Sequence, residues 1–277
     1  MTTSNTAPAA TAAVPCDEAP ELVSTLEHRR FGEFADAVRA DRYIGLCYGA
    51  PGVGKTISAR SYADWQHVRP LLGKDNWLHQ GTARPDWHTI FYTPLVNASP
   101  IRINKELNTL ATRHALLRAE SVIDFGTGRQ PHGASIHTEL LVVDEADRLA
   151  YRALEQVRDF YDRSHLGLIL IGMPGLEKRL ARYPQLYSRI GFVHHYRNLN
   201  PTELARVVAG WPDLGLNASD PATVETIAAI TRTTSGNFRL VTRLLAQAQR
   251  IAAINNLDRL TVEVIDAARD ALVIGTA

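Results

Sequence analysis

The sequence has few cysteines, few aromatic residues and no long hydrophobic run. Cys16 and Cys47 are the only two cysteines among 277 residues, so the chain carries neither a disulfide framework nor the spacing of a zinc site. The longest apolar run covers residues 166–173, whereas a membrane-spanning helix needs roughly 20 apolar residues. The first residues also lack the basic start and apolar segment of a secretory signal. We therefore expect a cytoplasmic protein that does not enter a membrane.

Charge of one sign is not in excess either. The chain has 30 Lys and Arg residues against 29 Asp and Glu residues, which gives a formal net charge of +1. This balance excludes a histone-like basic protein, but it does not exclude a polyanionic partner if the basic residues gather on one face. The length is sufficient for one large domain or for a core with a small satellite domain.

The order of apolar patterns predicts an α/β protein. Residues 1–20 are rich in Ala, Thr and Pro and are predicted to be a disordered arm. Between residues 21 and 198, apolar runs predict strands at 42–48, 89–96, 139–143, 167–171 and 192–196, and helical periodicity predicts helices at 21–39 (one or two), 56–64, 101–121 and 151–163. Residues 66–88 have no period and are predicted to be an extended connection. This alternation is typical of a doubly wound parallel sheet.

The pattern changes near residue 198. Four helical segments follow, at residues 201–211, 221–233, 238–255 and 261–272, without a further strand signal. We therefore predict an α/β core over residues 21–198 and a small all-α domain over residues 199–277.

The segment Gly49–Thr56 reads GAPGVGKT and matches the phosphate-binding loop pattern G-x-x-x-x-G-K-[ST]. It stands between a predicted strand and a predicted helix, as phosphate binding by backbone N–H groups requires. In such a loop Lys55 reaches the β and γ phosphates, and Thr56 is a ligand of Mg²⁺.

The segment Leu140–Glu145 reads LLVVDE, an apolar strand that ends in two carboxylates. In phosphoryl transfer an Asp at this place holds Mg²⁺ and a neighbouring carboxylate polarises the attacking water. We assign Asp144 to the metal and Glu145 to the base. Asp144–Asp147 also spells the DEAD signature of one helicase group, but the α/β pattern after Asp147 is too short for the second lobe that such helicases need. A GTPase is disfavoured because the base-reading Asn-Lys-x-Asp motif is absent from the sequence.

Two arginines are candidates for contact with a γ-phosphate. Arg189 precedes the last predicted strand, where it could reach the nucleotide of a neighbouring subunit; Arg182 is the alternative. An intrachain ion pair or an ordinary surface position is the other interpretation of Arg189. Residues 236–239 read GNFR at the start of a predicted helix, which would direct Arg239 back toward the nucleotide.

Together these motifs resemble those of AAA+ ATPases, over about residues 25–272. The resemblance implies a P-loop AAA+ core with a small C-terminal all-α lid, ATP and Mg²⁺ bound between core and lid, and hydrolysis assisted by a trans arginine in a ring or helical filament. The nucleotide contacts that it implies are Gly49, Gly52, Val53, Gly54, Lys55, Thr56, Ile57, Asp144 and Arg239, with Thr56 and Asp144 as the Mg²⁺ ligands and Glu145 and Arg189 as the catalytic residues.

Within AAA+ proteins, the short lid and the run from Arg42 to Trp65 look most similar to the transposition regulators of the MuB, TniB and TnsC group. That similarity implies assembly on double-stranded DNA with ATP and contact with a DDE transposase. It also implies DNA contacts on basic residues after the second strand; the candidates here are Lys105, Arg113, Arg118 and Arg129. For each of them, a solvated helix face is the alternative interpretation.

One feature departs from the AAA+ pattern. The strand at residues 168–171 is followed by Gly172-Met173-Pro174, where these ATPases commonly carry a polar Asn or Thr. Slow hydrolysis, suited to a switch, is the expected consequence. Other functions stay open at this point: an AAA+ ATPase of secretion of the ExeA type, a replicative helicase loader, or a scaffold in which nucleotide only stabilises the fold.

Overall fold

A five-stranded parallel sheet forms the centre of the molecule. The computed structural model describes residues 24–73, 84, 86–122, 137–211, 214, 216 and 220–272, so the predicted arm at 1–20 lies outside the described residues. The strands are β1 (Ile44–Tyr48), β2 (Thr89–Tyr92), β3 (Leu140–Val143), β4 (Gly167–Gly172) and β5 (Ile190–His195). Their order is β2-β3-β4-β1-β5, and every neighbouring pair is parallel.

This order places β1 between β4 and β5, inside the sheet. The chain leaves β1, crosses to the far edge at β2, and returns through β3 to β4, so the direction of winding reverses beside β1. In open α/β sheets a ligand binds outside the carboxyl ends of the strands at such a reversal. The loop that follows β1 is therefore at the position where the fold accepts a ligand.

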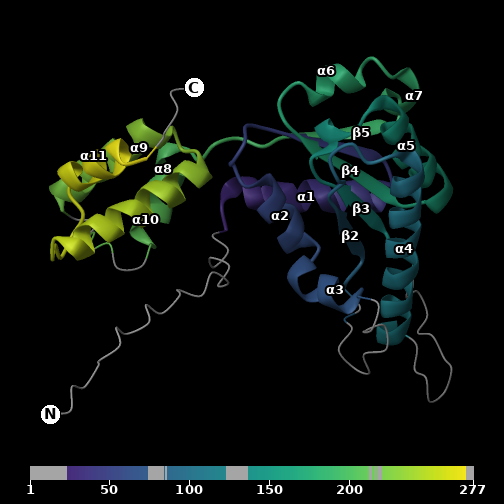
Figure 1. Ribbon diagram of the computed structural model, residues 1–277, viewed down its shortest axis with the longest axis horizontal. Helices are drawn as coiled ribbons and strands as arrows, with labels where there is room; N and C mark the ends of the chain where they lie inside the picture. Colours follow the sequence, from purple (N-terminus) through teal and green to yellow (C-terminus); the bar gives the residue numbers. More distant parts are fainter. Residues whose placement is uncertain are drawn as a thin grey trace, which may run out of the picture.

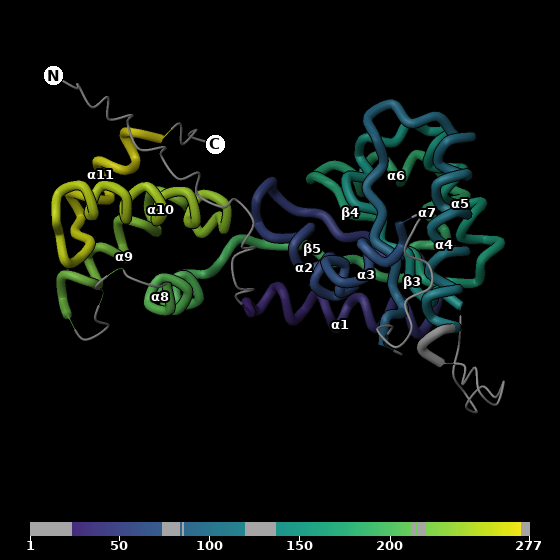
Figure 2. The backbone as a smooth tube through the Cα atoms, turned by 60° about the horizontal axis from the view of Figure 1, so that its bottom comes forward, coloured from purple at the N-terminus to yellow at the C-terminus, as the bar shows by residue number. Residues whose placement is uncertain are grey.

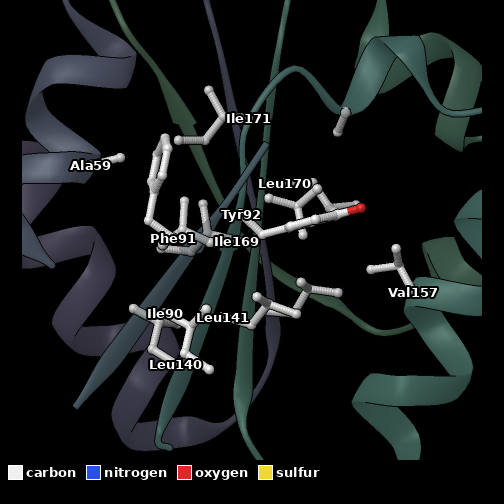
Figure 3. Packing of buried hydrophobic residues seen from close by; sticks show 14 of the residues in the cluster. Ala59, Ile90, Phe91, Tyr92, Leu140, Leu141, Val157, Ile169, Leu170 and Ile171 are labelled. Carbon is white, nitrogen blue, oxygen red and sulfur yellow. The ribbon is translucent and has the colours of Figure 1, made fainter. Parts of the chain in front are cut away.

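Helices cover both faces of the sheet (Figure 1). The core helices are α1 (Leu26–Asp41), α2 (Lys55–Tyr62), α3 (Trp65–Leu71), α4 (Pro100–Val122), α5 (Tyr151–Ser164) and the short α6 (Leu176–Leu180) and α7 (Pro184–Tyr187). Figure 3 shows Phe91 and Ile171 pointing toward Ala59 of α2, and Tyr92 and Leu170 pointing toward Val157 of α5. Successive strand residues thus supply cores on opposite faces.

The burial of the strands explains their apolar runs. Every residue of β3 and β4 is buried, whereas β5 at the sheet edge alternates between intermediate and exposed residues. Central parallel strands read as continuous hydrophobic runs because both of their faces are covered. The predicted doubly wound α/β fold is confirmed.

Two local predictions were wrong. Residues 66–88 do not form an extended connection from their start, because α3 runs to Leu71 and buries Trp65 and Val68. The strand predicted at 89–96 ends at Tyr92, before Pro94, whose nitrogen cannot donate a ladder hydrogen bond. The region predicted to hold one or two helices forms the single helix α1, where the Thr25 side chain accepts from the His28 backbone N–H at the N-cap.

The C-terminal helices pack around a hydrophobic cluster of their own. They are α8 (Pro201–Ala209), α9 (Pro221–Thr234), α10 (Phe238–Ile254) and α11 (Val262–Asp270). Leu204, Ile230, Leu244 and Ile265 have no exposed surface in this cluster, which is separate from the cluster around the sheet. In Figure 2 the chain runs from β5 directly to α8. We call these four helices the lid. Within the described ranges, no helix has the length and hydrophobicity needed to cross a bilayer.

Candidate nucleotide-binding site

The loop between β1 and α2 has the backbone of a phosphate-binding loop. Gly52 and Gly54 have φ values of 81° and 115°. These values lie in the left-handed region, which residues other than glycine rarely adopt. The next residue, Lys55, opens α2, with Gly54 at the N-cap. The first N–H groups of a helix have no partner within the helix, and together with its dipole they favour a bound phosphate.

Lys55 is buried against this loop. Its Nζ donates to the carbonyl oxygens of Gly49, at 2.7 Å, and Ala50, at 2.8 Å. Burial lowers the pKa of Lys55, whereas Cys47, Asp144 and Asp147 act to raise that pKa. Two carboxylates thus lie within electrostatic reach of the ammonium group, which can exchange its carbonyl partners for phosphate oxygens.

Thr56 and Asp144, predicted as Mg²⁺ ligands, lie together. The Thr56 hydroxyl donates to Asp144 Oδ2 at 2.8 Å, and the other carboxylate oxygen of Asp144 accepts from the backbone N–H of Glu145 at 2.9 Å. Asp144 is buried at the carboxyl end of β3. Hydroxyl and carboxylate oxygens are ligands that Mg²⁺ prefers, so the residues present fit a nucleotide with its magnesium ion.

Glu145 follows in a strained backbone conformation. Its φ of 53° lies in the left-handed region, which costs a residue other than glycine about 1–3 kcal/mol. Residues in such conformations cluster at functional sites. The side chain is 40% exposed and forms an ion pair with Arg148. The carboxylate predicted to act as the base is therefore accessible, but in this structure it is held by an arginine.

The N-terminus of α10 packs directly on the phosphate loop. The Arg239 backbone N–H donates to the Gly52 carbonyl oxygen at 2.9 Å. Asn237 caps the helix by accepting from the Leu240 N–H, and its amide donates to the Pro51 carbonyl oxygen at 2.8 Å. A Cβ on Gly52 would lie 2.7 Å from Arg239 Cβ, so a side chain there would prevent this approach. The GNFR segment is thus brought to the loop, and Asn237 is a contact that sequence reasoning treated only as a cap.

The remaining predicted nucleotide contacts differ in exposure. Val53 is buried in the loop, whereas Ile57, on the first turn of α2, is 46% exposed. Beside them, Ser58 Oγ lies 2.8 Å from Tyr196 Oη and 2.9 Å from His28 Nδ1, a chain of hydrogen bonds that connects α2 to α1 and to the segment after β5.

Arg189 is engaged within its own chain. Its Nε donates to Asp162 Oδ1 at 2.8 Å, and its Nη2 donates to Asp162 Oδ2 at 3.2 Å. This is the intrachain ion pair that the sequence left open as an alternative to a trans contact. Arg182, the alternative candidate, is exposed. Contact of either arginine with a neighbouring subunit stays a prediction.

The basic residues of α4 have different environments. Lys105 is exposed and lines a hollow of about 580 Å³ together with Tyr92, Arg102 and Thr109. Arg113, which is partly buried, donates to the Leu72 carbonyl oxygen at 2.8 Å.

Arg118 does not fit its predicted contact with DNA. It is only 4% exposed, donates to the Trp87 carbonyl oxygen at 3.0 Å and pairs with Glu139 at 3.0 Å. Because a buried, paired guanidinium cannot reach a phosphate at the surface, the prediction for Arg118 is corrected: it is an internal ion-pair residue. Arg129 lies outside the described residues.

These features define a P-loop ATPase: a phosphate loop joins a strand to a helix, a threonine hydroxyl donates to a buried aspartate, and a helical lid packs on the loop. The family model described as "AAA domain" matches residues 38–180. The chain therefore belongs to the AAA family of ATPases. The fold of this family implies nucleotide binding, typically with Mg²⁺.

Similar proteins were found by sequence and by structure. A "Potential ATP-binding protein" of Staphylococcus aureus is 41% identical over 92% of this chain and 97% of its own length. The Mu-like prophage FluMu DNA transposition protein B of Haemophilus influenzae is 25% identical over 83% of this chain and 73% of its own length.

Solved structures share the fold. The Thermotoga maritima RuvB Holliday junction branch migration motor matches with a TM-score of 0.57 and 16% identity, over 90% of this chain and 69% of that chain. The Aeropyrum pernix ORC2 protein in its ADP form matches with a TM-score of 0.56 and 17% identity, over 93% of this chain and 71% of that chain. At these identities the likeness concerns the architecture alone.

Proposed function

We propose that this protein is an ATP-dependent, sequence-nonspecific DNA-binding regulator of DNA transposition. In this proposal it assembles on target DNA as a ring or helical filament and recruits or activates a DDE transposase. The observation that carries the proposal is the similarity to a DNA transposition protein B over most of both chains. The family itself accounts for ATP binding but not for a role in transposition.

The surface of α4 supports binding to a polyanion. Arg102 and Lys105 stand one turn apart on exposed positions of the first half of the helix, beside the hollow that Tyr92 and Thr109 also line. Arg102 is paired with Glu106 at 2.7 Å, so Lys105 is the better candidate for a phosphate contact. Contacts to phosphates position a protein on DNA without reading its sequence, which favours nonspecific binding.

The nucleotide site supports hydrolysis with assigned roles. Lys55 binds the β and γ phosphates, Thr56 and Asp144 hold Mg²⁺, and Arg239 approaches the nucleotide from the lid. Glu145 polarises the attacking water after its ion pair with Arg148 opens. Arg189 serves as the trans finger once it exchanges Asp162 for the phosphate of a neighbouring subunit. Both ion pairs therefore favour a resting state in the isolated subunit.

Electron microscopy with duplex DNA tests this function. Samples contain the full chain with ATP, with a non-hydrolysable ATP analogue, or without nucleotide, and the variant Glu145→Gln with ATP serves as a hydrolysis-blocked control. We expect regular rings or filaments on DNA with the analogue, and also with Glu145→Gln and ATP, but none without nucleotide. If DNA stays bare in every sample that contains nucleotide, the proposal is wrong.

A further inference from the structure

The carboxylate of Asp147 occupies the end of β4. The strand ends in Gly172 and is followed by Met173 and Pro174, so it offers no polar side chain of its own there. Asp147 Oδ1 instead accepts from the Met173 backbone N–H at 3.2 Å. A Cβ on Gly172 would lie 2.8 Å from the same oxygen. The missing side chain at residue 172 is what makes room for the carboxylate of Asp147.

Arg179 of α6 fixes the turn that carries Asp147. Asp147 belongs to the 3-10 turn Ala146–Arg148, directly after Asp144 and Glu145. Its backbone carbonyl accepts from Arg179 Nη1 of α6 at 2.6 Å, and Arg179 also donates to the Leu149 carbonyl oxygen. The turn is thus held through its main chain, and the side chain of Asp147 is only partly buried, so part of it is accessible to a ligand.

The position lies between the two motifs of the nucleotide site. Gly172 pairs in register with Tyr48, the residue before the phosphate loop, and on the other side β4 pairs with β3, which leads to Asp144. Asp147, like Asp144, acts to raise the pKa of Lys55. The carboxylate therefore lies at the same edge of the sheet as the phosphate loop and Asp144, where a nucleotide on this loop would be bound.

We infer that Asp147 is a positioning residue for ATP hydrolysis, whose carboxylate accepts a hydrogen bond from the attacking water at the end of β4. This inference rests on the proposed ATPase activity. In the reaction, the water oxygen forms a bond to the γ-phosphorus, and the bond from that phosphorus to the bridging oxygen breaks, so that this oxygen leaves with ADP. One proton of the water passes to Glu145 and then to solvent, and the other stays on the released phosphate. An ionised carboxylate accepts but does not donate hydrogen bonds, so Asp147 orients the water rather than the phosphate.

The variant Asp147→Asn separates this role from a structural one. Asparagine has nearly the same size and keeps one oxygen that can accept from the Met173 N–H. It replaces the second oxygen with an NH₂ group, which donates and cannot accept a hydrogen bond from the water. We expect kcat to fall at least about tenfold while KM stays within about twofold of the wild type, because only transition-state positioning is lost. We expect the thermal unfolding midpoint to be unchanged, since the turn keeps its hydrogen bonds.

A binding measurement gives a readout independent of turnover. ADP with aluminium fluoride and Mg²⁺ mimics the transition state, and its affinity is compared with that of a non-hydrolysable ATP analogue by titration of a fluorescent nucleotide. Asp147→Asn should bind the analogue as the wild type does and lose the added affinity for the mimic. Asp159→Asn, which removes an exposed carboxylate paired with Arg163 on α5, is the matched control and should change neither value.

The outcomes distinguish the inference from the proposed function. If Asp147→Asn hydrolyses ATP and binds the mimic as the wild type does, the inference is wrong and the proposed function is untouched. If the wild type hydrolyses ATP but never assembles on DNA, the proposed function is wrong, and the comparison between Asp147→Asn and the wild type still decides the inference. A wild type without any ATP hydrolysis overturns the inference itself.

Discussion

Two basic residues of one helix show how the position of a residue decides whether its side chain is exposed or buried. Lys105 and Arg118 both belong to α4, yet Lys105 is exposed and Arg118 is almost fully buried. Arg118 follows the buried Leu107 by about three turns and the buried His114 by about one turn, so it lies on the apolar stripe of the helix. The helical period could have predicted its burial from the sequence. The positive charge of the side chain instead favoured the prediction of an exposed position, because buried arginines are rare unless they are paired.

The variant Arg118→Met should destabilise the fold. Methionine leaves the Trp87 carbonyl and one oxygen of Glu139 without this donor, although Glu139 keeps its ion pair with Arg39. We expect the free energy of unfolding in urea to fall by about 2 kcal/mol. The matched variant Lys105→Ala should stay within about 0.5 kcal/mol of the wild type, since its position is exposed. DNA binding should show the reverse: weakened in Lys105→Ala and unchanged in folded Arg118→Met.

At the scale of elements, the sequence predicts best what is long or fully buried. The strands β1, β3 and β4 and the four lid helices coincide with their predicted segments to within a few residues, because continuous burial or several turns of period leave a clear pattern. The helix α3 was missed since it is short, contains Pro70 and buries only Trp65 and Val68. Two buried residues are too few to establish a helical period.

The start of α10 carries a prediction about the contact between the lid and the phosphate loop. Asn237 both caps this helix and donates to the Pro51 carbonyl oxygen of the phosphate loop. Serine is as good a cap but is too short to reach Pro51. Asn237→Ser should therefore unfold like the wild type, whereas Asn237→Ala should lose about 1 kcal/mol of stability. Both should bind ATP about fivefold more weakly, because a hydrogen bond between lid and loop is lost.

Fluorescent-nucleotide titration and urea unfolding measure the two effects separately. If Asn237→Ser binds ATP as tightly as the wild type, the contact with Pro51 has no part in holding the nucleotide. Asn237 would then act only as the cap of α10.

At the scale of the whole molecule, motifs and tertiary contacts are not equally accessible to sequence reasoning. The phosphate loop and Asp144 could be recognised because their residues are close in sequence or follow a buried strand. The strand order could not be predicted, since continuous apolar runs carry no information about which strands are neighbours. The long-range contacts between core and lid, such as the hydrogen bond from the Leu26 N–H to Glu203 at 2.5 Å, could not be predicted either. The Glu145–Arg148 and Arg189–Asp162 pairs likewise appear only in the folded chain.

The near-neutral charge of the whole molecule leads to the last prediction. With a net charge of +1 and Lys105 as the main exposed candidate on α4, one subunit can neutralise only a few phosphates. Affinity for DNA should then come from assembly of many subunits with ATP. Because each neutralised phosphate releases a counterion, raising the salt from about 50 to 200 mM should weaken ATP-dependent binding by an order of magnitude or more. Binding without nucleotide should be weak at both salt concentrations. Fluorescence anisotropy with duplexes of unrelated sequence measures this; tight binding that persists at high salt or needs no nucleotide would contradict it.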